Sequence, residues 1–182
     1  VITPDLPGFG KSNKAKSHNN IQSIANLLLD CLEDKKIYKF YLLGHSMGGM
    51  IVQEMAKKVG DKISKLICYS TGPTGEMPDR FETIDQSREN LKNKGLETTV
   101  KNITKTWFVK GESAKYFDIC IEAGKQTSME TADNALVAMK NWNGVDKLKN
   151  IKNETLIVWG DQDKSYNLEQ VQTLENNIEN SK

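Results

Sequence analysis

The sequence predicts an α/β fold: a parallel sheet with helices on both faces and an inserted helical cap. Short apolar runs alternate along the chain with stretches in which apolar residues recur at helical spacing. A segment over residues 71–153 interrupts this alternation and is far too long for a loop between adjacent units. The order of strand, helix and strand implies parallel pairing with crossover helices.

The elements of the first third follow from local patterns. Val1–Thr3 resembles the end of a buried strand, and Asn20 is a candidate N-cap for the helix that follows. That helix has one apolar face, made of Ile21, Ile24, Leu27, Leu28, Cys31 and Leu32. The runs over residues 37–43 and 63–69 predict two strands. Met47–Val59 predicts the helix between them, closed by Gly60 at the C′ position.

The remainder predicts a helical insertion and one more strand and helix. Four apolar helical faces lie between residues 71 and 153. Thr155–Trp159 predicts a strand, and Leu168–Lys182 predicts a helix. The predicted domains are an incomplete core over residues 1–73 and 154–182 and a cap over residues 74–153. Because the chain starts with Val1 inside a predicted strand, we expect it to be an internal piece lacking both ends of a longer protein.

Composition narrows the classes of function. The 182 residues carry 25 Lys and Arg against 24 Asp and Glu, a formal net charge of +1. A chain with so little net charge lacks the positive electrostatic field that would attract it to nucleic acid or an anionic membrane. No apolar stretch approaches the roughly 18 residues of a membrane span. We therefore expect a small-molecule substrate and neither nucleic acid nor membrane as a partner; the oligomeric state is left open.

The cysteines and histidines predict no metal site. The three cysteines, Cys31, Cys68 and Cys120, are widely spaced and form no CxxC pair, and His18 and His45 are the two histidines. We expect no zinc, no disulfide framework, no cofactor, and a reducing, cytoplasmic compartment. Gly10-Lys11-Ser12 is not a phosphate loop, because Asp5 stands where that motif requires glycine.

The sharpest chemical signal is the run Gly44-His45-Ser46-Met47-Gly48-Gly49, where a predicted strand meets a predicted helix. A Gly-x-Ser-x-Gly turn in that setting is a nucleophile elbow, with the serine hydroxyl exposed beyond the strand end. Gly44 and Gly48 are expected to clear space for the turn. The N–H of Met47, at a helix N-terminus, is a candidate oxyanion donor.

Three segments together resemble the α/β-hydrolase superfamily, specifically its esterases, lactonases and carbon–carbon bond hydrolases. They are residues 5–12, the elbow over residues 44–49, and residues 156–163. The resemblance implies that Ser46 is the nucleophile and Asp163 the acid of a catalytic triad, with Asp161 as a competitor for that role. It further implies a serine hydrolase that acts on an ester, lactone or other activated carbonyl through an acyl-enzyme.

The base of this triad is not found in the chain. The family order is serine, acid, histidine, and no histidine follows Asp163. We expect the base to lie outside this piece and the piece alone to be inactive; His45 and His18 are weak substitutes. The alternatives are a non-catalytic binding protein, or an acyltransferase or haloperoxidase-like enzyme. Candidate pocket residues on the insertion are Trp107, Phe108 and Phe117, each equally compatible with core packing.

Overall fold

A computed structural model describes all residues from Val1 to Lys182. The chain divides into two compact units. One comprises Val1–Asn19 and Arg80–Ala138, and the other comprises Asn20–Asp79 and Met139–Lys182. Residues 1–19 thus group with the helical insertion, and residues 139–153 group with the sheet. The division into a hydrolase core and a cap stays a prediction.

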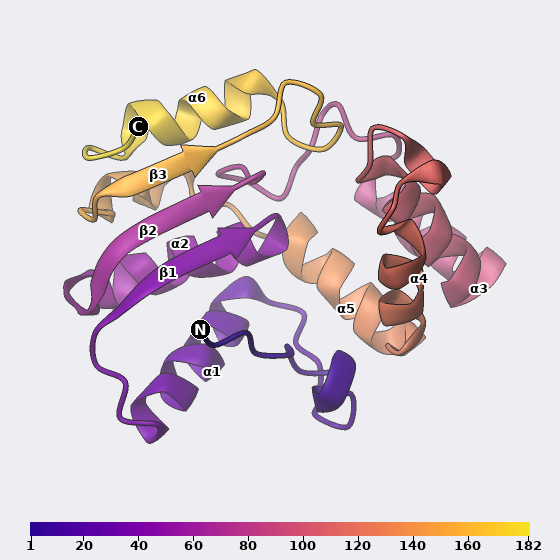
Figure 1. The fold of residues 1–182 in the computed structure, drawn as a ribbon, viewed down its shortest axis with the longest axis horizontal. Coiled ribbons are helices and arrows are strands. Elements are labelled where there is room, and N and C mark those ends of the chain that lie inside the picture. Colours follow the sequence, from indigo (N-terminus) through magenta and orange to yellow (C-terminus); the bar gives the residue numbers. More distant parts are fainter. The chain divides into compact units, whose positions relative to one another are not determined.

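The second unit contains a three-stranded parallel sheet in the order β1-β2-β3 (Figure 1). The strands are β1 (Phe40–His45), β2 (Ile63–Tyr69) and β3 (Thr155–Val158). His45 is aligned with Tyr69, and Tyr69 with Val158, so all three strands end in one row. The predicted parallel sheet is confirmed.

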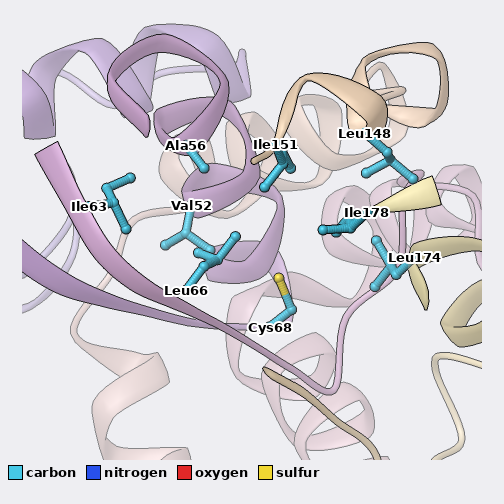
Figure 2. Close-up of a cluster of buried hydrophobic side chains, with 9 residues drawn as sticks. All are labelled: Val52, Ala56, Ile63, Leu66, Cys68, Leu148, Ile151, Leu174 and Ile178. Atoms are coloured by element: carbon cyan, nitrogen blue, oxygen red, sulfur yellow. The ribbon is translucent and has the colours of Figure 1, made fainter. Parts of the chain in front are cut away.

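Three helices accompany this sheet. They are α1 (Ile21–Asp34), α2 (Met47–Val59) and α6 (Leu168–Asn177). Asn20 caps α1 as expected, because its side chain accepts a hydrogen bond from the Ser23 N–H. Apolar side chains of α2, α6 and β2 share one buried cluster with the short 3₁₀ segment Val145–Asn150 (Figure 2). Its members are Val52, Ala56, Ile63, Leu66, Cys68, Leu148, Ile151, Leu174 and Ile178.

The two faces of the sheet differ. Strand residues alternate between faces, and this cluster lies on one of them. On the other face Tyr41 is 75% exposed and Leu43 is 59% exposed, with Leu156 and Val158 exposed on β3. The predicted covering of helices is therefore present on one face, where α2 and α6 pack.

The first unit is helical. Its long helix α3 (Ile84–Thr106) begins at a capping box, in which Thr83 and Gln86 exchange side-chain to backbone hydrogen bonds. Gly95, at a φ of 80°, breaks the helical path inside α3. The Arg88 guanidinium of α3 donates two hydrogen bonds, of 2.7 and 3.1 Å, to the Asp133 carboxylate. The remaining helices are α4 (Phe117–Lys125) and α5 (Met129–Lys140), the last two residues of which fall in the second unit. The first unit also has 3₁₀ turns at Gly10–Ser12 and Gly111–Ser113.

Three local predictions are wrong. Val1–Thr3 forms no strand, and Val1 and Ile2 are exposed, because no neighbouring strand supplies backbone hydrogen bonds to them. Gly60 has a helical φ of −54° and begins the 3₁₀ turn Gly60–Lys62 instead of a left-handed cap. Helix α6 ends at Asn177, and Ser181 then forms a bridge with Thr155 of β3.

None of the helices combines the length and the apolar character needed to cross a bilayer.

Candidate active site

The candidate site lies in the second unit, at the carboxyl edge of its sheet. Because His45, Tyr69 and Val158 are aligned, the residues that follow them emerge side by side. In open parallel sheets this edge is where ligands bind. Ser46 follows β1, Ser70 and Thr71 follow β2, and the loop that carries Asp163 follows β3.

Ser46 has the strained backbone expected of an elbow. Its φ of 52° and ψ of −121° lie in a region that non-glycine residues rarely adopt. Such strain costs on the order of 1–3 kcal/mol and persists only where the surroundings enforce it. Gly44 allows the close packing of this turn, since a Cβ there would collide with the Gly48 carbonyl and the Val52 side chain.

The role expected for Gly48 is wrong. A Cβ at Gly48 would meet no atom within 4 Å, whereas one at Gly49 would collide with the Thr71 side chain. Besides Gly44, the glycine of this turn that allows a close approach is therefore Gly49. The sequence showed two adjacent glycines, but which of them faces a neighbour depends on the loop after β2.

Four hydrogen bonds hold the Ser46 backbone. The Ser46 N–H lies 3.1 Å from both the Tyr69 and the Ser70 carbonyl oxygens. The Ser46 carbonyl accepts from the Gly49 N–H at 2.8 Å and from the Thr71 hydroxyl at 2.8 Å. Thr71 is buried, and no sequence motif marked it as part of the site. Ser70, with a φ of 41°, is strained as well.

Asp163 organises the loop after β3. Its carboxylate Oδ1 accepts hydrogen bonds from the N–H groups of Ser165 (2.8 Å) and Tyr166 (3.0 Å). This carboxylate is partly buried, and its Oδ2 is not used in those bonds. Asp161, the competing acid, is exposed. The two aspartates therefore differ in environment, and Asp163 is the one built into the structure of the loop.

Tyr166 connects that loop to Ser46. The Tyr166 hydroxyl lies 3.3 Å from the Ser46 hydroxyl, across 120 residues of sequence. Its side chain is 1% exposed, and its ring packs closely against Gly72. The Trp159 indole N–H donates to the Tyr166 carbonyl at 2.7 Å. Sequence analysis missed Tyr166, since only the alignment of β3 with the other strands brings it to the elbow.

His45 is the last residue of β1, and its side chain lies beside that of Tyr69 on the neighbouring strand. Its ring centroid lies 5.0 Å from that of Tyr69. Although part of its surface remains open to solvent, neighbouring protein atoms desolvate the imidazole and lower its pKa from the ordinary value of 6.5. The negative charge of Asp163 acts in the opposite direction and raises it. His18 lies in the other unit and is partly buried.

Two further expectations concern the oxyanion donor Met47 and the aromatic residues of the helical unit. Met47 is the first residue of α2, so its N–H belongs to the helical turn that has no carbonyl acceptor of its own. In the helical unit, the Phe108 and Phe117 rings meet edge to face at 6.4 Å, and Phe117 is buried. Those two rings pack within that unit, and Trp107 is exposed. Their role in a substrate pocket stays a prediction.

Comparison with known proteins agrees with this architecture. A sequence model of the alpha/beta hydrolase fold matches residues 1–182. An Escherichia coli protein named 2-hydroxy-6-oxononadienedioate/2-hydroxy-6-oxononatrienedioate hydrolase is 27% identical over 175 residues, which is 90% of this chain and 60% of that protein. Matches to other curated relatives cover between 20% and 25% of their lengths.

Solved structures share the fold at low sequence identity. The enol-lactonase from Burkholderia xenovorans LB400 superposes with a TM-score of 0.84 and 18% identity, over 98% of this chain and 68% of that one. A bromoperoxidase from Bacillus anthracis superposes with a TM-score of 0.86 and 21% identity, over 97% of this chain and 69% of that one. The fold class predicted from the sequence is confirmed.

Proposed function

The chain belongs to the alpha/beta hydrolase fold family, and from this premise we propose that it is a serine hydrolase with Ser46 as its nucleophile. The observation that carries the proposal is the strained Ser46, with a φ of 52°, between the end of β1 and the start of α2. Backbone strain of this kind clusters at functional sites, where the surrounding structure maintains it.

The proposed reaction is acyl transfer through Ser46. The Ser46 oxygen attacks the carbonyl carbon and forms an ester, the leaving group departs with a proton, and water then releases the acyl group. The Met47 N–H supports the developing oxyanion, because it points from a helix N-terminus. Asp163 orients the imidazole base and stabilises its protonated form without taking the proton.

The base assigned in this proposal is a histidine beyond residues 1–182. Neither His18 nor His45 follows Asp163 in the sequence, and the lowered pKa of His45 has desolvation as its main cause. Sequencing of the coding DNA on both sides tests this assignment. A histidine after one further strand supports it. A downstream strand without histidine favours a non-catalytic relative.

The proposed substrate class is an ester, lactone or other activated carbonyl. Two comparisons support this class: the E. coli relative is named a 2-hydroxy-6-oxononadienedioate/2-hydroxy-6-oxononatrienedioate hydrolase, and a Burkholderia protein of the same fold is an enol-lactonase. Cleavage at one of these carbonyls requires the same elements: a nucleophile, a base and an oxyanion site. A panel of aryl esters, lactones and vinylogous diketones would separate the members of the class.

A fluorophosphonate probe tests the nucleophile directly. The protein as its gene encodes it should be labelled once, at Ser46, and the Ser46→Ala variant should not react. Ser181→Ala is the matched control, because Ser181 lies beyond α6 and donates to the Ile178 and Glu175 carbonyls. A folded protein in which Ser46 remains unlabelled would contradict the proposal.

A further inference from the structure

We infer that Tyr166 is a hydrogen-bond partner of the Ser46 nucleophile that holds its hydroxyl in one orientation. The inference rests on the proposed function of Ser46 and assigns a new residue to that site. Its basis is the distance of 3.3 Å between the two hydroxyl oxygens. Such a pair is informative because most side-chain hydrogen bonds go to the backbone or water instead of to another side chain.

The position of Tyr166 is fixed from three sides. Its N–H is held by Asp163, and its carbonyl accepts from the Trp159 indole. Its ring packs against Gly72, where the added Cβ of any other residue would lie 3.1 Å from the tyrosine Cδ1. At 1% exposure the side chain is enclosed by close-packed neighbours. The hydroxyl is thus presented to Ser46 by a preorganised support.

The direction of the hydrogen bond follows from acidity. A phenol is more acidic than an aliphatic alcohol and is the better donor. With Tyr166 as donor, the Ser46 oxygen accepts on one side, and its own proton stays available for a base. Tyr166 keeps its proton throughout. In deacylation the Ser46 oxygen leaves the acyl carbon, takes up a proton from the base, and is stabilised by the tyrosine O–H as it leaves.

The same loop therefore carries two groups toward one reaction. Asp163 is the proposed acid, and Tyr166 lies three residues later with its N–H bonded to the Asp163 carboxylate. A shift of that carboxylate would move the tyrosine hydroxyl as well. The segment from Asp163 to Tyr166 therefore links the orientation of the Asp163 carboxylate with that of the Ser46 hydroxyl.

Tyr166→Phe tests the inference, because it removes the hydroxyl and keeps the ring against Gly72. We expect the rate of fluorophosphonate labelling at Ser46, and kcat with an aryl ester, to fall about three- to tenfold, the value of one hydrogen bond. KM should stay unchanged, and the melting temperature should fall by only a few degrees, the effect of one lost hydrogen bond. Tyr41→Phe is the matched control, since Tyr41 is exposed on β1. An unchanged rate in Tyr166→Phe would overturn the inference.

A second measurement does not depend on activity. With 3-fluorotyrosine at position 166, the ¹⁹F resonance should move in Ser46→Ala and stay in place in Ser181→Ala. A ¹⁹F chemical shift that is the same with and without Ser46→Ala would overturn the inference. This measurement remains decisive even if Tyr166→Phe folds poorly. If the protein with Ser46 intact is never labelled while the resonance does move, the proposed hydrolase activity fails and the contact between Tyr166 and Ser46 stands.

Discussion

Thr71 donates its side-chain hydroxyl to the Ser46 carbonyl oxygen at a distance of 2.8 Å. The bond joins the strained elbow to the segment around the end of β2, where the carbonyls of Tyr69 and Ser70 also accept from the Ser46 N–H. It explains how a φ of 52° is maintained at a serine, because groups on a neighbouring strand hold both sides of its peptide backbone. The stability of the elbow is thus a property of two strands together.

Loss of the Thr71 hydroxyl should loosen the elbow. Thr71→Val keeps the shape of the side chain but leaves the Ser46 carbonyl with the Gly49 N–H alone. We expect the free energy of unfolding to fall by about 1 kcal/mol, the net value of a buried hydrogen bond. Urea unfolding measures it. Thr173→Val is the control, because Thr173 makes the same type of bond to Glu169 on the exposed side of α6; an equal loss in both variants would contradict the special role of Thr71.

The two glycines at the start of α2 should respond differently to alanine. At Gly49 the new methyl group meets the buried Thr71 side chain, and overpacking of this kind costs about 1–3 kcal/mol. At Gly48 the space is open, and alanine should be neutral or stabilise by up to about 1 kcal/mol through helix propensity. Denaturant midpoints of Gly48→Ala and Gly49→Ala give the comparison. Equal midpoints would show that the contact with Thr71 is unimportant.

Replacement of Asp163 should separate fold from activity. Asp163→Asn retains an oxygen that can accept from the Ser165 and Tyr166 N–H groups, so the melting temperature should change little. The charge that supports an imidazolium is lost, and kcat should fall by about 10²- to 10⁴-fold. Asp161→Asn, at an exposed position, should leave kcat within about twofold. The reverse ranking in a steady-state assay would assign the acid to Asp161.

His45 should make the protein less stable in mild acid. Its pKa is lowered in the folded protein from 6.5, so the unfolded chain binds the proton more readily. The free energy of unfolding therefore falls as the pH drops below about 6.5 and levels off below the pKa of the folded state. His45→Gln should flatten this slope in urea unfolding between pH 7.5 and 5.

The same imidazole reports on Asp163. Because the charge of Asp163 raises the pKa of His45, Asp163→Asn should lower that pKa further. An NMR titration of the two histidines, assigned with His18→Gln, measures this shift. A His45 pKa at or above 6.5 would contradict the desolvation argument, and an unchanged value in Asp163→Asn would show that the two groups do not interact.

The elements that sequence reasoning located correctly are those with a strong local cause. Asn20 starts α1 because its side chain can reach the Ser23 N–H within one turn. The strand over Ile63–Tyr69 and the helix over Met47–Val59 have the bounds that their apolar patterns indicate. The local apolar pattern wrongly predicted a strand at Val1–Thr3, since a strand exists only where another strand pairs with it.

The sequence by itself determined the parallel α/β architecture, the family and the turn that carries Ser46, because periodicity, glycine spacing and motif order are written in neighbouring residues. Only the tertiary structure decided that Gly49, not Gly48, makes the close contact, and that Thr71 and Tyr166 bond to Ser46. These relationships depend on the register of β1, β2 and β3. Register joins residues far apart in the chain, where no local pattern records the partner.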